Sequence, residues 1–110
     1  NHPVELDRDV LAAMQSLRKV GVQLLSHSVL LKGVNDSKMI LEQLFRLLSN
    51  NGILPYYLNQ LDKVKGAAHF EVPKEEGLIL MQQLQASLPG YAVPKYVQEI
   101  PFAESKVRLS

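Results

Sequence analysis

Cysteine and tryptophan are both missing from this 110-residue sequence, and aromatic residues of other kinds make up only 6% of it. Without cysteine the chain forms no disulfide, carries no thiol nucleophile and supplies no thiolate to a metal site. No secretory signal is apparent, and apolar runs such as Val29–Leu31 and Leu78–Met81 are too short to cross a bilayer. We therefore expect a cytoplasmic location and no membrane partner.

An excess of charge of either sign is also lacking. Twelve lysine and arginine residues nearly balance eleven aspartate and glutamate residues, for a net charge of +1, and the basic residues are scattered. Such a distribution offers no field to attract nucleic acid, so we expect no nucleic-acid partner. Hydrophobic residues make up 46% and charged residues 21%, which is typical of a globular chain and not of a disordered one.

Hydrophobic spacing predicts three helices. Over residues 6–20, apolar side chains recur at three- and four-residue steps, as one face of a helix requires. A second helix is expected over 37–49, with Asp36 as its N-terminal cap. Pro73 fits the first position of a third helix that runs to about residue 88.

Extended segments alternate with these helices. Val22–Leu31 is nearly continuous in apolar residues, which is typical of a strand covered on both faces. Ile53–Leu58 is expected to be a second strand, followed by a polar loop over Asn59–Val72. Tyr91–Ile100 is expected to be the third, and Pro94 inside it indicates an edge strand or a strand end.

The alternating order predicts an α/β fold with parallel strands and right-handed helical crossovers, as in barrels and doubly wound sheets. In such folds chemistry collects at the C-terminal ends of the strands. Polar residues lie within the first strand and after the other two: Ser26, His27, Ser28, Asn59, Gln60, Asp62 and several of 99–106. Three strands leave two open sheet edges, and we expect the rest of a barrel to cover them.

Four stretches of the sequence together resemble the lysine 2,3-aminomutase family. They are Asn1-His2-Pro3, SVLLKGVND at 28–36, PYYLNQLD at 55–62, and the segment from Ala92-Val93-Pro94 to Lys106. SVLLKGVND followed by PYYLNQLD is the most specific part. The branch that makes β-lysine for modification of translation elongation factor P is the most similar. Its likeness lies in residues 102–105, Phe-Ala-Glu-Ser rather than a glycine run, and in the chain stopping at Ser110.

The resemblance implies that residues 1–110 are a single fragment. They would form the C-terminal βα units of a partial (βα)6 TIM-like radical S-adenosylmethionine (SAM) barrel, with a pyridoxal phosphate (PLP) lysine in the loop at 99–106. It implies an isomerase that moves an amino group from carbon 2 to carbon 3 of L-lysine. The cofactors would be PLP, SAM and a 4Fe-4S cluster, with the cluster's cysteines upstream of Asn1. The fragment alone is expected to be inactive.

The same resemblance implies partners for the chain. They are L-lysine as substrate, the upstream part of its own chain and, indirectly, the elongation factor P modification pathway. A homo-oligomer is left open.

The resemblance also implies four site residues. Lys106 aligns with the family's Schiff-base lysine, for which the chemistry needs a primary amine on a flexible stem. Asp62 matches a carboxylate that holds the substrate's ε-ammonium. Glu99 stands at a second ammonium-binding carboxylate, where ordinary aminomutases use aspartate. His27 replaces an amide residue that contacts bound SAM in the relatives.

Structural alternatives exist for each of these residues. Lys106 would otherwise be a solvated surface charge, Asp62 a loop residue paired with a nearby lysine, and Glu99 an exposed strand end. His27 would be a histidine on a buried strand whose hydrogen bonds are satisfied by its neighbours. The histidines show no spacing typical of a metal site, so no metal ligand is expected in this chain. Tyr56 and Tyr57 are predicted to belong to the core.

Two other functions fit the sequence. One is a non-catalytic α/β binding or interaction module that uses its open sheet edge. The other is a PLP enzyme without radical chemistry, which the lack of a glycine-rich phosphate loop disfavours.

Overall fold

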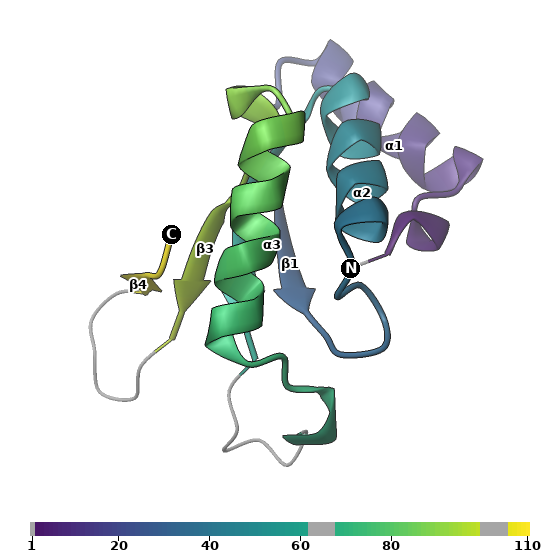
Figure 1. The fold of residues 1–110 in the computed structure, drawn as a ribbon. Coiled ribbons are helices and arrows are strands. Elements are labelled where there is room, and N and C mark those ends of the chain that lie inside the picture. The colour runs from purple at the N-terminus through teal and green to yellow at the C-terminus, as the bar shows by residue number, and fades with distance from the viewer. Residues whose placement is uncertain (1, 62–67, 100–105) are drawn as a thin grey trace.

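The computed structural model describes residues 2–61, 68–99 and 106–110 (Figure 1). The elements in chain order are η1 (Pro3–Glu5), α1 (Arg8–Lys19), β1 (Leu24–Leu30), α2 (Lys38–Asn50), β2 (Ile53–Gln60), η3 (Ala68–Phe70), α3 (Lys74–Ser87), η4 (Gly90–Ala92), β3 (Lys95–Gln98) and β4 (Val107–Arg108). The alternation confirms the predicted α/β class. Within the described ranges, no helix is both long and apolar enough to span a membrane.

The four strands form one sheet in the order β1-β2-β3-β4. β1, β2 and β3 run parallel, whereas β4 is antiparallel to β3. Neighbouring parallel strands joined by crossovers of one hand carry their helices on the same side. Figure 1 accordingly shows α2 and α3 side by side over one face of the sheet. In a barrel, the helices likewise all lie on one face of the sheet. Closure of this sheet into a barrel stays a prediction.

Helix α1 begins and ends as its sequence predicts. The Asp7 side chain caps it by accepting a hydrogen bond from the backbone N–H of Val10 at 2.9 Å. Gly21, with φ of +90°, allows the chain to turn back after the helix. Gln15 donates from Nε2 to the carbonyl of Asn51 at 2.6 Å, which ties α1 to the C-terminal end of α2.

The cap of α2 differs from the prediction. Ser37, not Asp36, is the N-cap residue, and its hydroxyl accepts from the N–H of Ile40 at 3.2 Å. Asp36 instead accepts from the N–H of Gly33 at 2.9 Å within the preceding turn. Asp36 and Ser37 are adjacent short polar residues. Asp36 forms its hydrogen bond within the turn, so Ser37 caps the helix.

Further boundaries also differ from prediction. Pro73 is the N-cap of α3 and not its first helical residue. Residues 90–92 form the 3-10 turn η4, so β3 begins only at Lys95, after Pro94. β3 lies between β2 and β4, so Pro94 marks a strand end and not an edge strand. The antiparallel β4 was not predicted at all.

The core lies between the helices and the sheet face that they cover. Its fully buried members come from both layers: Leu30, Leu41, Phe45, Leu58, Met81, Leu84 and Tyr96. A buried hydrogen-bond chain crosses it, in which the Tyr96 hydroxyl donates to Gln60 Oε1. Gln60 Nε2 then donates to the carbonyl of Val72 at 2.7 Å. Polar groups at this depth are stabilising only when they are paired in this way.

A register shift in β2 changes the direction of its side chains. Ser26 pairs with Pro55 but His27 pairs with Tyr57, so Tyr56 is an extra residue in β2. Tyr56 and Tyr57 consequently lie together, with ring centroids 4.5 Å apart, and neither ring is part of the core. The prediction that they belong to the core is wrong, because a bulge interrupts the alternation of strand side chains.

The sheet face opposite α2 and α3 carries a second group of polar and aromatic side chains, separate from Tyr96 and Gln60. We call it the open face; its residues are His27, Tyr56, Tyr57, Asn59 and Lys95, with Glu99 and Lys106 at its C-terminal end. His27 packs edge-on to Tyr57 at 5.1 Å, and Lys95 Nζ lies 4.7 Å from the Tyr56 centroid. In Figure 1, α2 and α3 both lie on the other face of the sheet.

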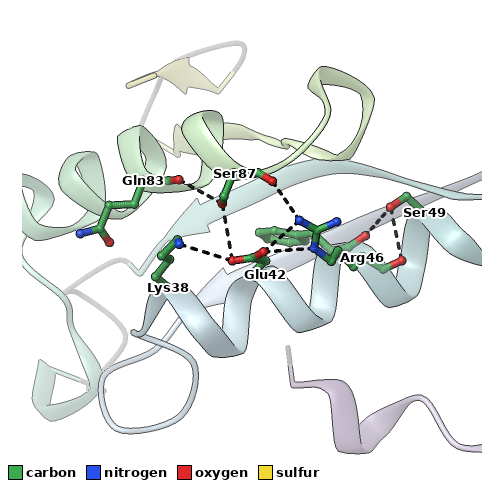
Figure 2. Close-up of polar contacts among 7 residues, drawn as sticks. Lys38, Glu42, Arg46, Ser49, Gln83 and Ser87 are labelled. Atoms are coloured by element: carbon green, nitrogen blue, oxygen red, sulfur yellow. Dashed lines mark hydrogen bonds and ion pairs between the residues drawn. The ribbon is translucent and has the colours of Figure 1, made fainter.

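A polar clamp joins α2 to α3 on the outer surface (Figure 2). Arg46 donates to the Glu42 carboxylate from Nε at 3.1 Å and to the Ser87 carbonyl from Nη2 at 2.9 Å. Lys38 Nζ lies 3.7 Å from the same carboxylate. The hydrogen bond from Arg46 lowers the pKa of Glu42, with a smaller contribution from the charge of Lys38.

Candidate functional site

Lys106 lies at the C-terminal end of the open face with its amine among three partners. Its Nζ donates a hydrogen bond to Asn59 Oδ1 and lies 3.8 Å from Glu99 Oε1. The same nitrogen lies 5.1 Å from the centre of the Tyr57 ring. Only 25% of the Lys106 side chain is exposed, which is unusual for a surface lysine. The amine is therefore held in a defined place.

Strand β4 explains how Lys106 reaches this place. Its residues pair antiparallel to β3, with Arg108 opposite Val97. Beyond β4, the backbone of Tyr96 donates to Ser110 at 3.0 Å and accepts from Leu109 at 2.7 Å. The residues after Lys106 are thus fixed on β3, and the Lys106 side chain reaches Asn59 of the neighbouring strand β2.

Asn59 occupies the middle of the sheet. It is paired in register with Val29 of β1 and Val97 of β3. Its side-chain Nδ2 donates to the carbonyl of Ser28 at 3.1 Å. The carboxamide is therefore oriented from one side by β1, and its oxygen faces Lys106.

His27 joins the same group of side chains through Tyr57. Both His27 and Lys106 contact the Tyr57 ring, the first edge-on and the second with its amine near the ring. Cations are attracted to the negative face of an aromatic ring. Tyr57 thus lies between an exposed imidazole and the partly buried lysine.

Among the described residues, the site pairs the Lys106 amine with the Glu99 carboxylate at the protein surface. The Glu99 side chain is 68% exposed, so its ion pair with Lys106 contributes little to stability. The Asn59 carboxamide is less exposed and accepts from Lys106 directly. Asn59 thus makes a hydrogen bond to the amine, and Glu99 adds a negative charge beside it.

Three of the four residues predicted for the site are brought together. Lys106, Glu99 and His27 all lie on or beside the open face, within reach of one another through Tyr57. Asp62 lies outside the described residues. Asn59 was predicted to lie in a polar loop and Tyr57 in the core. The two residues are two positions apart, and in a strand this spacing would have indicated that their side chains share a face.

Of the three cofactors that the resemblance implies, the arrangement fits PLP in part. A partly buried primary amine facing an open surface suits condensation with the aldehyde of PLP. An iron–sulfur cluster does not fit, because the chain has no cysteine to ligate it. In the parts of the chain that the structure describes, no three histidine, aspartate or glutamate side chains converge on a metal site.

No family model matches the chain. It is similar to the L-lysine 2,3-aminomutase of Haemophilus influenzae, with 51% identity over 100 residues, 91% of this chain and 30% of that protein. The enzyme of the same name from Escherichia coli is 47% identical over 109 residues, 99% of this chain and 32% of that protein. By descent, the chain is a relative of the lysine 2,3-aminomutases. The resemblance noted in its sequence is confirmed.

The relationship has two limits that matter for function. The chain spans about a third of the length of the lysine 2,3-aminomutases it matches. It is also 34% identical, over 99% of its length, to the glutamate 2,3-aminomutase of Clostridioides difficile, of which it covers 26%. Relatives named for two different substrates therefore share this segment. The choice between substrates has to come from the residues of the site.

Proposed function

We propose that this chain is the C-terminal portion of a 2,3-aminomutase acting on L-lysine, and that PLP attaches to Lys106. The observation that carries the proposal is the Lys106 amine, held at the C-terminal end of the open face by Asn59 with Glu99 beside it. An isolated surface lysine would have neither the partial burial nor the two acceptors.

PLP, when bound, supplies the aldehyde through which an amino group is held while it moves between neighbouring carbons. The residues of this chain would fix the place of that chemistry. Lys106 brings the amine, Asn59 orients it, and the Tyr57 ring covers one side of it. Burial of the lysine stem keeps the amine from sampling many positions.

Charge favours a substrate with a cationic side chain. Glu99 lies on the open face with most of its carboxylate exposed, so it is accessible to a second cation. A carboxylate attracts the ε-ammonium of lysine through charge-assisted hydrogen bonds and repels the side chain of glutamate. We propose that Glu99 holds the substrate ammonium, and Asp62 is assigned the same role.

The radical part of the reaction would depend on chain outside this segment. His27 is proposed to contact SAM from the exposed part of β1, while the cysteines for a 4Fe-4S cluster would lie upstream. Formation of β-lysine for elongation factor P, in the cytoplasm, is the physiological role that we propose. The upstream part of the chain would cover the open face and complete a barrel.

The substrate test uses the complete protein that contains this segment. It is incubated anaerobically with PLP, SAM, a reductant and either L-lysine or L-glutamate, and the β-amino acids are measured. We expect β-lysine and no β-glutamate. Lys106→Arg should lower kcat at least about a hundredfold, because a guanidinium does not condense with an aldehyde. Lys74→Arg, on the exposed side of α3, is the matched control.

Two results would contradict the proposal. The first is turnover of L-glutamate in preference to L-lysine, which would overturn the role of Glu99. The second is undiminished activity of Lys106→Arg, which would remove the amine from the reaction altogether.

A further inference from the structure

We propose that Asn59 is the positioning residue for the Lys106 amine, holding it in one place on the open face whenever it is not joined to a cofactor. This inference rests on the proposed function of Lys106. It assigns a role to a residue that belongs to no catalytic pattern in the sequence. The sequence predicted it only as one of several polar residues after the second strand, with no role of its own.

The Asn59 carboxamide is held at both of its polar atoms. Nδ2 donates to the Ser28 carbonyl of β1 at 3.1 Å, and Oδ1 accepts from Lys106 Nζ. The backbone on either side of it is fixed, because Asn59 pairs with both neighbouring strands in the sheet. A side chain held in this way has little freedom to follow a moving lysine, so the lysine conforms to it.

The polarity of the two contacts allows only one orientation of the amide. If the carboxamide were turned over, its oxygen would face the carbonyl oxygen of Ser28 and its NH₂ would face the ammonium of Lys106. Both pairs would be like with like, acceptor against acceptor and donor against donor. Ser28 therefore decides that Asn59 presents an acceptor to Lys106.

The other neighbours of Lys106 do not define its position as closely. Glu99 lies 3.8 Å away on a side chain that is 68% exposed, so its attraction carries little direction. The Tyr57 ring attracts the amine from 5.1 Å but accepts it over a wide area. The directed hydrogen bond to Asn59 is the contact that selects a single site for Nζ.

The test measures how readily Lys106 is acylated in the cofactor-free complete protein. A trace of an amine-directed acylating reagent is added, and labelling of Lys106 is expressed relative to Lys95, which lies on the same face over Tyr56. Asn59→Ala should raise this ratio roughly tenfold, the size expected for losing a hydrogen bond to a charged group. Asn50→Ala, an exposed asparagine at the end of α2, is the matched control.

Asn59→Asp separates positioning from a purely structural role. Both variants lose the donor to Ser28, but aspartate keeps an oxygen that accepts from Lys106. We expect the labelling ratio of Asn59→Asp to stay at or below that of the unaltered protein. A ratio that rises equally in Asn59→Ala and Asn59→Asp, or in neither, would overturn the proposal. Circular dichroism spectra confirm that each variant is folded.

Failure of this inference is distinguishable from failure of the proposed function. Attachment of PLP to Lys106 is read separately, by reducing the cofactor onto the unaltered protein and mapping the modified peptide. If PLP does not attach at Lys106 but the labelling ratios follow the expected order, Asn59 holds the lysine and the proposed function is wrong. If PLP attaches but the ratios do not respond, only the role of Asn59 is wrong.

Discussion

Tyr96 of β3 packs so closely against Gly77 of α3 that the helix has no room for a side chain at that position. A β-carbon on residue 77 would lie 2.6 Å from Cζ of the Tyr96 ring and nearer still to its hydroxyl oxygen. The same hydroxyl donates to Gln60 of β2. One buried tyrosine therefore connects a helix and two strands, including the strand that carries Asn59.

Gly77→Ala should destabilise the protein, although alanine is the better helix former. Overpacking against a fully buried ring costs about 1–3 kcal/mol and the usual helix gain of about 1 kcal/mol offsets part of it, so we expect a net loss of up to about 2 kcal/mol. Urea denaturation measures it. In a Tyr96→Leu background the same substitution should cost much less; an equal cost in both backgrounds would show that Tyr96 is not the obstacle.

Stability should fall in alkaline solution through Tyr96. Burial, with a smaller contribution from the charge of Glu75, raises the pKa of Tyr96 to about 12 from an ordinary 10.0. Because the folded-state pKa is the higher one, the stabilisation is complete below pH 10 and is lost as the pH rises toward 12. The loss should be on the order of 2 kcal/mol. Tyr96→Phe should lack this dependence, and a variant with the same alkaline decline would rule Tyr96 out as its source.

Asn35, in the SVLLKGVND segment, is fully buried and structural. Its Oδ1 accepts from the N–H of Leu31 at 2.8 Å and its Nδ2 donates to the carbonyl of Val29 at 2.8 Å. Asn35→Ala removes both bonds and should cost roughly 2–3 kcal/mol in unfolding free energy. Asn50→Ala should change it little, because Asn50 is exposed. Similar values for the two variants would show that this buried pair contributes little.

The clamp of Glu42 and Arg46 should make stability depend on acid pH. The hydrogen bond from Arg46 lowers the pKa of Glu42 below 4.5. A depressed folded-state pKa means that the stabilisation is present above 4.5 and is lost as the pH falls through the lower value. The difference in Tm between the unaltered protein and Glu42→Gln should therefore shrink on acidification. A difference that is constant with pH would mean that the carboxylate charge contributes nothing.

The helices and most of the strands were predictable because their side chains follow regular periods. Asn59 and Gln60 were placed in a loop because they open the polar stretch that follows the apolar run Ile53–Leu58. They lie in the strand because they pair with Val29 and Leu30 of β1, residues far away in the sequence. The shared face of Tyr56 and Tyr57 depends on a bulge that leaves no mark in the composition of β2.

Lys106 itself was found by resemblance, but its surroundings were not predictable from spacing. Asn59 lies 47 residues away along the chain, and the pairing of β4 with β3 holds the backbone that follows Lys106 in the same sheet. That strand has two residues, too few for a periodic pattern. Individual residues of the candidate site were therefore predictable from the sequence. The contact between Lys106 and Asn59 could be found only in the three-dimensional structure.

Attachment of PLP is the most direct test of the central claim. The complete protein is incubated with PLP, reduced with borohydride and digested, and the peptide carrying the pyridoxyl group is identified by mass spectrometry. We predict a single adduct on Lys106, absent from Lys106→Arg and unchanged in Lys74→Arg. An adduct on other lysines with Lys106 unmodified would contradict the assignment of this chain to a PLP-dependent aminomutase site.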